Sequence, residues 1–317
     1  MKKYTSRLRR LRVDEPSFYL PPYKVEKVLL SLSESIDWGI ELLGIPNFWK
    51  HTKGKGITVA ILDTGIALNH PDLKDAILDT KDFTDSLSGV YDQEGHGTHV
   101  AGIVAARNNG HGVIGVAPEC KLLIGKVLGD NGFGKADAIA AGIEWAIASG
   151  ADIISMSLGS NAPFPIIQKA IEKAIDKNVF VIAAAGNDGL LDNIDYPGAY
   201  EGVITVGSID RRKQLSSFSD WGVEVDVVAP GDEITSTYPP NITATISGTS
   251  MATPFVAGVA ALVLSKHRQY GGKTKLETQE QMRKHLIKTA IDLGPNGFDK
   301  GFGFGLLNPV KLAELVP

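Results

Sequence analysis

The sequence predicts an α/β protein, a three-layer αβα arrangement in which helices cover both faces of a mainly parallel central sheet. From residue 57 onward, short apolar runs alternate with amphipathic segments. The apolar runs contain few polar residues, which is typical of parallel strands that are buried on both faces. A length of 317 residues is large for one domain, yet a single large α/β sheet can accommodate it. We therefore expect one main domain.

The apolar runs define the expected strands, which span residues 57–62, 122–127, 153–156, 179–184 and 203–206. Two intervening segments, 136–147 and 167–174, repeat apolar residues at the helical spacing i, i+3, i+4 and i+7 and are predicted to be crossover helices. Segments 100–106 and 251–264 are rich in small apolar residues and predict buried helices. The more polar segment 278–289 predicts a surface helix.

Composition excludes several classes of function. A net charge of -4 is too small to indicate a nucleic-acid or membrane partner, and no apolar run reaches the length of a membrane span. A single cysteine, Cys120, excludes an intramolecular disulfide and suits a reducing compartment. Residues 1–32 contain no apolar stretch typical of a secretion signal. We expect a cytoplasmic protein.

The N-terminus carries a short basic run. Its cations are Lys2, Lys3, Arg7, Arg9, Arg10 and Arg12. A solvated tail is the favoured interpretation, and an arm that binds nucleic acid or a membrane is the alternative.

Three glycine-flanked motifs carry an acid, a base and a nucleophile in that chain order. They are DTG at residues 63–65, HGTH at residues 96–99 and GTSMA at residues 248–252. Nucleophilic hydrolysis needs a hydroxyl, an imidazole that accepts its proton, and a carboxylate that orients the imidazole. Ser250, His96 and Asp63 are the candidates for these roles. Asp63 follows an expected strand, where ligands of parallel sheets bind.

The order of these groups, and several further segments, resemble the subtilisin-like serine proteases. The additional segments are KVLG at 126–129, ISMSLG at 154–159, AAAGN at 183–187, VAPG at 228–231 and SMATP at 250–254. The resemblance extends from about Glu34 to Leu315. It implies a subtilisin-like fold and a serine endopeptidase that acts through an acyl-enzyme. It also implies that the side-chain amide of Asn187 and the backbone N–H of Ser250 bind the oxyanion.

The resemblance assigns two segments to the flanks of an extended peptide substrate, with ordinary loops as the alternative. They are Ser157, Leu158 and Gly159, and Gly132, Phe133 and Gly134. Asp195 is placed at the floor of the S1 pocket, where a carboxylate favours lysine or arginine. Glu94 could attract a basic P2 side chain. The alternative is that both acids are solvated and the pocket accepts large apolar residues.

Two cation sites are implied by the resemblance, with solvated turns as the alternative at each. A tight Ca²⁺ site would use the carbonyls of Arg107, His111 and Val113, the side chains of Asn109 and Asp72, and Glu34 as a sixth ligand. A weaker Ca²⁺ or Na⁺ site would use the carbonyls of Gly198, Tyr200 and Val203 with Glu224 and Asp226.

The N-terminal extension, residues 1–32, is short beside the propeptides of secreted subtilisins, and the catalytic domain is expected at residues 33–317. The motif Leu20-Pro21-Pro22-Tyr23 resembles one found in the bacterial intracellular subtilisins. We hypothesise that it lies in the cleft as a pseudo-substrate. Proline lacks an N–H and fixes φ, so the geometry near Pro21 or Pro22 would be wrong for attack. Removal of the extension, by a cut between Tyr23 and Glu34, would activate the zymogen.

The expected partners are protein or peptide substrates, the inhibitory extension itself and, by resemblance, a second copy in a homodimer. Neither nucleic acid nor a membrane is expected. Three rival functions stay open: a catalytically silent binding protein, an esterase or acyltransferase with the same triad, and a protease tethered to nucleic acid by the basic run.

Overall fold

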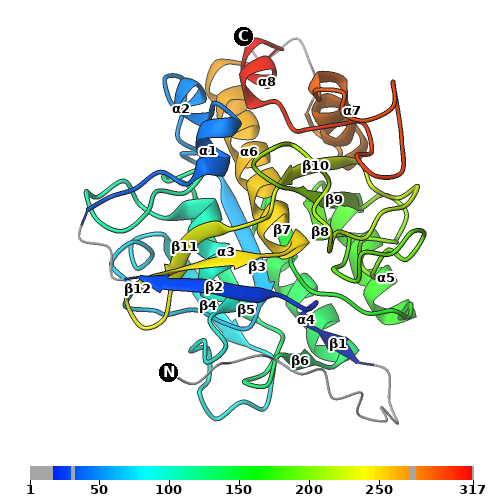
Figure 1. The fold of residues 1–317 in the computed structure, drawn as a ribbon. Helices are drawn as coiled ribbons and strands as arrows, with labels where there is room; N and C mark the ends of the chain where they lie inside the picture. Colours follow the sequence, from blue (N-terminus) through cyan, green and yellow to red (C-terminus); the bar gives the residue numbers. More distant parts are fainter. Residues whose placement is uncertain (1–16, 30–32, 272–275, 316–317) are drawn as a thin grey trace.

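The computed structural model describes residues 17–29, 33–271 and 276–315. At its centre lies a seven-stranded sheet in the order β10-β9-β8-β7-β3-β5-β4, in which all neighbouring strands are parallel (Figure 1). The strands are β3 (Thr58–Asp63), β4 (Ile77–Asp82), β5 (Lys121–Lys126), β7 (Ile153–Met156), β8 (Phe180–Ala184), β9 (Ile204–Ile209) and β10 (Val227–Pro230). The five predicted strands are thus confirmed, while β4 and β10 were not predicted.

Two layers of helices cover the sheet, which confirms the three-layer prediction. In β3, successive side chains point to opposite faces, so Ile61 packs in the cluster that contains Val256, and Leu62 in the cluster that contains Ile143. One layer holds α3 (His96–Ala105) and α6 (Thr249–Tyr270), and the other holds α4 (Ala136–Ala148) and α5 (Pro165–Asp176). The remaining described helices are α1 (Trp38–Leu42), α2 (Ile45–Phe48), α7 (Gln279–Thr289) and α8 (Pro309–Leu315). Helix α8 contacts α6, α2 and α7, and α1 contacts α2.

Helix α6 is the core helix of the protein. It is the one described helix that is long and apolar enough to cross a membrane, but its most apolar window is completely buried inside the fold. Small residues allow the close packing that was expected. A Cβ built on Gly258 would lie 2.6 Å from the side chain of Val116. The burial identifies α6 as a helix of the protein interior.

Two small antiparallel sheets tie the N-terminal segment to the rest of the fold. The two-stranded sheet pairs β1 (Phe18–Tyr19) with β6 (Phe133–Gly134). The three-stranded sheet has the order β11-β12-β2, with β2 (Lys24–Leu29), β11 (Ile234–Tyr238) and β12 (Ile242–Ser247). The segment, dark blue in Figure 1, therefore runs along one side of the molecule. The basic run at residues 2–12 lies outside the described residues.

Candidate active site

The turn after β3 packs tightly against the start of α3. Gly65 has a φ of +111°, and a Cβ built there would lie 2.4 Å from the carbonyl oxygen of Val90. A Cβ on Gly97 would lie 2.4 Å from the carbonyl oxygen of Gly65. Glycine is needed at both positions because any side chain would clash with backbone atoms. This close contact brings the end of β3, Asp63, beside the first residue of α3, His96.

Asp63 and His96 form a buried pair. The Nδ1 atom of His96 lies 2.8 Å from Oδ1 of Asp63, and neither side chain is more than 1% exposed. Thr64 donates its backbone N–H to the same Oδ1. Because a carboxylate only accepts hydrogen bonds, the imidazole hydrogen is on Nδ1 and the lone pair is on Nε2. That Nε2 has no hydrogen-bond partner among the described residues.

Ser250 lies in the first turn of α6, but its hydroxyl is not bonded to His96. It donates a long hydrogen bond, 3.4 Å, to the carbonyl oxygen of Ser157, and the Ser157 hydroxyl donates in turn to the carbonyl oxygen of Ser250 at 2.9 Å. The hydrogen bond between Asp63 and His96 is therefore present, whereas the Ser250 hydroxyl bonds to Ser157 and not to His96.

The orientation of Asn187 is fixed by Thr249. The backbone N–H and the hydroxyl of Thr249 both donate to Oδ1 of Asn187, at 2.8 and 2.7 Å. The amide nitrogen of Asn187 must then point away from Thr249. It donates to the carbonyl oxygen of Pro22, at 3.0 Å.

The two predicted substrate edges enclose the N-terminal segment. On one side, Tyr19 exchanges two backbone hydrogen bonds with Gly159, at 2.9 and 3.0 Å. On the other side, Phe18 pairs with Gly134 and Tyr19 with Phe133, and the N–H of Leu20 donates to the carbonyl oxygen of Gly132 at 3.1 Å. Residues 18–20 thus form the middle strand between the two edges. Phe18 is fully buried, and its ring lies 5.1 Å from that of Phe164.

The segment then covers the Asp63–His96 pair. Tyr23 places its ring 5.1 Å from the imidazole of His96, and β2 continues alongside β12. Ser250 and His96 are both fully buried as a result.

Residues 54–305 match the sequence profile of the subtilase family. The chain belongs to this family. It is 44% identical to an intracellular serine protease of Paenibacillus polymyxa over 95% of this chain and 93% of that protein. It is 41% identical to the major intracellular serine protease of Bacillus subtilis, over 93% of this chain and 95% of that protein. The identity to subtilisin Savinase of Lederbergia lenta is 42%, over 87% of this chain and 98% of that protein. Subtilases are serine endopeptidases, and this is the activity of the chain.

Two acidic side chains of the subtilase contact tyrosines of the N-terminal segment. The Tyr19 hydroxyl donates to Oδ1 of Asp195, at 3.3 Å. Asp195 is 4% exposed, and burial, followed by repulsion from Asp220 and Asp188, raises its pKa to about 7. The half-buried Glu94 bonds with the Tyr23 hydroxyl, and burial raises its pKa as well. Asp195 is therefore not a solvated loop residue in this structure.

Sequence analysis did not identify Asp92, which joins the turn after β3 to the start of α3. Its Oδ1 accepts from the hydroxyl of Thr64 and the N–H of Gly95, both at 2.8 Å. Its Oδ2 accepts from the N–H and the hydroxyl of Thr98, both at 2.7 Å. Asp92 is fully buried. The sequence held one signal for this role: an acidic residue shortly before a predicted helix can bind the free N–H groups at the helix start.

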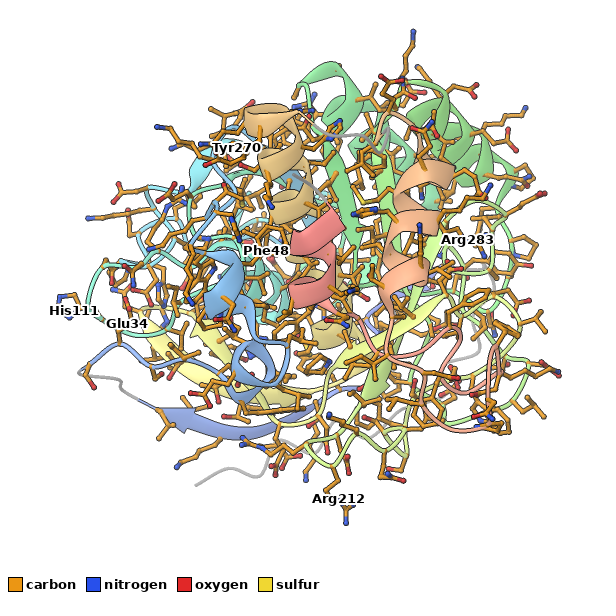
Figure 2. The ribbon with its side chains drawn as sticks, turned by 90° about the horizontal axis from the view of Figure 1, so that it is seen from above. Glu34, Phe48, His111, Arg212, Tyr270 and Arg283 are labelled. Carbon is orange, nitrogen blue, oxygen red and sulfur yellow. The ribbon has the colours of Figure 1, made fainter. Side chains whose placement is uncertain are left out.

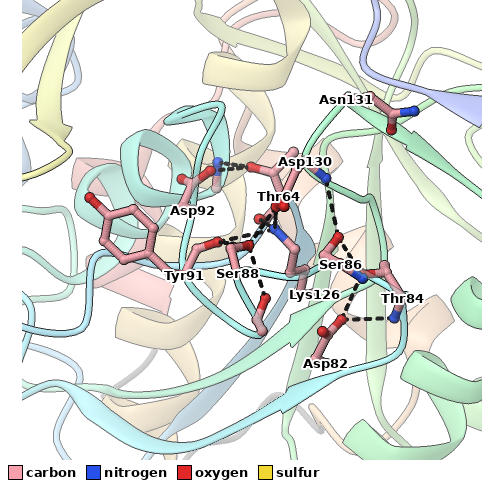
Figure 3. A network of polar contacts seen from close by, with 12 residues as sticks. Thr64, Asp82, Thr84, Ser86, Ser88, Tyr91, Asp92, Lys126, Asp130 and Asn131 are labelled. Atoms are coloured by element: carbon pink, nitrogen blue, oxygen red, sulfur yellow. Dashed lines mark hydrogen bonds and ion pairs between the residues drawn. The ribbon is translucent and has the colours of Figure 1, made fainter.

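Lys126 extends the same polar network, which Figure 3 shows. Its fully buried ammonium donates to the carbonyl oxygens of Thr64 and Tyr91, at 2.6 and 3.1 Å. It also forms an ion pair of 2.9 Å with Asp130, which lies in the loop that leads to β6. Sequence analysis included Lys126 in the motif at 126–129 but assigned no role to it. The network connects the turn after Asp63 with one substrate edge.

Asp72 is the centre of the first predicted cation site. It is 1% exposed, and its two oxygens accept from the side chain of Asn109 at 3.0 Å and from the N–H of Val113 at 3.1 Å. The carbonyl oxygens of Arg107, His111 and Val113 accept no hydrogen bond from the described part of the chain. The donor set, all oxygen, fits a hard cation such as Ca²⁺.

The side chains of Glu34 and His111 are not directed toward the predicted cation site. The carboxylate of Glu34 accepts from the N–H groups of Asn109 and Gly110, both at 2.9 Å, so it holds the loop backbone. His111 and Glu34 lie on the same edge of the molecule, and the His111 side chain points outward (Figure 2). Within residues 17–29, 33–271 and 276–315, no cluster of three His, Cys, Asp or Glu side chains has the geometry of a metal site.

At the second predicted cation site, the structure pairs Asp226 with a basic residue. Arg283 lies 2.6 Å from Oδ1 of Asp226. The carbonyl oxygen of Gly198 accepts from the Thr205 hydroxyl at 2.7 Å, and that of Tyr200 accepts from the N–H of Val203 at 3.3 Å. Glu224 is exposed. The guanidinium of Arg283 thus balances the charge of Asp226, which the prediction had assigned to a bound cation. The second cation site stays a prediction.

Proposed function

We propose that this subtilase hydrolyses peptide bonds with Ser250 as nucleophile, His96 as general base and Asp63 as the carboxylate that orients the imidazole. The observation that carries the proposal is the buried 2.8 Å bond between Asp63 and His96, which leaves the lone pair of Nε2 free to accept a proton. Ser250 needs only to leave the carbonyl oxygen of Ser157 to offer that proton.

The chemistry follows from these positions. The Ser250 oxygen attacks the scissile carbonyl while its proton moves to Nε2 of His96, and Asp63 stabilises the imidazolium. The oxyanion is held by the amide of Asn187 and the backbone N–H of Ser250, at the positive end of α6. His96 then gives its proton to the leaving amine, and a water molecule, activated by His96, hydrolyses the acyl-enzyme. The hydrogen bond from the amide of Asn187 to the carbonyl oxygen of Pro22 supports this assignment, because it shows that the amide can donate to a carbonyl oxygen of a chain in the cleft.

Substrates are bound as an added strand between the segments 157–159 and 132–134. Support comes from residues 18–20, which make these contacts within the chain itself. Backbone pairing of this kind suits proteins and peptides and offers nothing to a small ester, so it favours an endopeptidase over an esterase.

We further propose that residues 1–32 inhibit a catalytic domain at residues 33–317, so that the protein is made as a zymogen. In the antiparallel pairing of Tyr19 with Gly159, Pro21 lies opposite Ser157. A substrate residue there would donate its N–H to the Ser157 carbonyl oxygen, but proline has none. That oxygen accepts from the Ser250 hydroxyl instead. The nucleophile is thereby kept away from His96 while the extension fills the cleft.

Calcium is proposed to hold the loop at residues 107–113. Asp72, the carbonyls of Arg107, His111 and Val113, and Asn109 would bind it, with a rotation of the Asn109 amide. When bound, the ion supplies positive charge to the buried Asp72 and fixes the loop. It has no part in the chemical steps.

A cytoplasmic location is proposed because the two relatives with matching length are named intracellular proteases and because the single cysteine is buried. Burial raises the pKa of the Cys120 thiol to about 12, so the thiol is unreactive. The homodimer depends on the family resemblance alone, and light scattering of the purified protein tests it.

One experiment tests the catalytic assignment. After the extension is cut, a fluorophosphonate probe is expected to label Ser250 and casein is expected to be digested. Ser250→Ala should lose both reactions, whereas Ser149→Ala, a change outside the site, should retain them. Digestion of casein by Ser250→Ala would refute the proposal.

A further inference from the structure

The carboxylate of Asp195 lies within the substrate cleft. A Cβ built on Gly159 would be 2.3 Å from its Oδ2, and a Cβ on Gly186 would be 3.2 Å from the same oxygen. Gly159 pairs with the strand in the cleft, and Gly186 directly precedes Asn187, which holds the Pro22 carbonyl. The carboxylate is therefore placed between the substrate edge and the oxyanion donor. A long side chain next to the attacked carbonyl can reach it there.

This pocket holds negative charge without a cation. Asp220 is fully buried behind Gly186, and its Oδ2 has no hydrogen-bond partner among the described residues. A Cβ on Gly186 would be 2.3 Å from that oxygen. Asp188 is an exposed acid in the same loop. In the described ranges, no lysine or arginine forms an ion pair with any of the three acids.

Burial without a counter-ion changes the pKa of Asp195 and of Asp220. Burial and the repulsion among them raise the pKa of Asp195 to about 7 and that of Asp220 to about 6. The groups that face Asp195 are Asp220, Asp188 and, from β1, the Tyr19 hydroxyl. The tyrosine fills the pocket with a neutral donor, 3.3 Å from Oδ1, and leaves the charge unbalanced.

We infer that, once the N-terminal segment has left, this pocket binds a cationic side chain, so that the peptidase cleaves after arginine or lysine. The inference deepens the proposed function and rests on it. A guanidinium supplies both the missing positive charge and several N–H donors, where Tyr19 supplies one hydroxyl. An apolar side chain in the same place would desolvate ionised Asp195 without a partner, which is unfavourable.

The test uses arginine and citrulline, which have nearly the same shape and differ in charge. Two peptides that differ only in this residue compete in one tube with the full-length protein. The ratio of their kcat/KM values is independent of the fraction of molecules whose cleft is open. A charge-assisted bond in a partly buried site predicts that arginine is preferred by roughly 10- to 100-fold.

Asp195→Asn is expected to reduce the ratio to near one. The matched control is Asp192→Asn, which removes the same charge from an exposed acid of the same loop that pairs with Lys300. This control should keep the arginine preference.

Each outcome is decisive. A wild-type protein that cleaves the citrulline peptide, or a leucine peptide, as well as the arginine peptide overturns the inference and leaves the proposed function intact. An unchanged ratio in Asp195→Asn also overturns it. If Asp195→Asn does not fold, the wild-type ratio alone decides. A wild-type protein that cleaves none of the peptides even after its extension has been removed refutes the proposed function, and the inference with it.

Discussion

At the scale of single residues, Asp92 fixes the relative positions of Asp63 and His96. Its four accepted hydrogen bonds connect Thr64, beside Asp63, with Gly95 and Thr98, which flank His96 in the chain. A fully buried carboxylate with every bond satisfied defines one arrangement of its neighbours. Asp92 contacts no reacting atom in this description and is a positioning residue.

Asp92→Asn should therefore lower kcat more than it changes KM. An amide cannot accept from all four donors, and each buried group left unsatisfied costs about 1–3 kcal/mol of stability. A small displacement of the imidazole lowers kcat by up to roughly 100-fold. Steady-state kinetics and thermal unfolding measure both effects, with the exposed Asp85→Asn as control. A fall in stability with an unchanged kcat would contradict the positioning role.

Asp195 makes the closure of the cleft depend on pH. Its pKa is about 7 beneath the extension and should fall toward the ordinary value when the cleft opens, because solvent then reaches the carboxylate. The closed form thus binds the proton more tightly. It is favoured at low pH, and this contribution is lost as the pH rises through about 7.

Hydrogen exchange of the Leu20 amide, which bonds to Gly132 in the closed form, can follow this equilibrium. In the inactive Ser250→Ala protein, protection corrected for the intrinsic rate should decrease between pH 5 and 8. The double variant with Asp195→Asn should lose most of this dependence. Equal pH dependence in both proteins would exclude Asp195 as the cause.

At the scale of elements, the proposed inhibition depends on the prolines of the N-terminal segment. Pro21→Ala would place an N–H opposite the Ser157 carbonyl oxygen and release the Ser250 hydroxyl toward His96. We expect faster self-cleavage within residues 21–23, measured by intact mass over time. Pro163→Ala, at an exposed proline outside the cleft, is the control. A Pro21→Ala protein as resistant as the wild type would contradict this mechanism.

The loop at residues 107–113 should be stabilised by calcium. A ligand present at 100 times its dissociation constant stabilises the folded state by about 2.7 kcal/mol. Calcium should therefore raise the melting temperature of the wild-type protein by several degrees, and EDTA should reverse the increase. Asp72→Asn should abolish the response, and Asp75→Asn, at a neighbouring exposed acid, should keep it. Equal melting temperatures in calcium and EDTA would refute the site.

Which elements could be predicted depended on what stabilises them. The five predicted strands of the central sheet are apolar on both faces, and α5 repeats apolar residues at helical spacing, so their own sequences predicted them. In contrast, β2 has the sequence KVEKVL and every residue exposed. Its strand conformation comes from pairing with β12, which lies more than 200 residues later. Local patterns contain no signal for such pairing.

The same distinction holds within the candidate site. Glycine-flanked motifs marked Asp63, His96 and Ser250, since sharp turns need glycine. The register of Tyr19 against Gly159, the Tyr19–Asp195 contact and the diversion of Ser250 to Ser157 all depend on how distant segments meet. Side-chain chemistry alone could not have predicted these contacts.

At the scale of the whole molecule, a protein that begins at Ser33 should be more active on short peptides than the full-length protein, and less stable. It loses β1 and β2, which cover Ser250 and His96 and pair with β6 and β12. Kinetics and thermal unfolding of the two proteins measure both effects. Equal activity would show that residues 1–32 do not inhibit.

The attachment of β2 has a practical consequence. Its six residues are all exposed, so it is held to β12 through its backbone, which pairs with β12 and accepts one further bond from the Thr243 hydroxyl at the carbonyl oxygen of Leu29. Its amino-acid identity is thus free to vary, unlike that of the buried Phe18. Residues 24–29 can be replaced by the recognition sequence of an unrelated protease. Cleavage by that second enzyme would then remove the segment and start proteolysis at a time that the experimenter chooses.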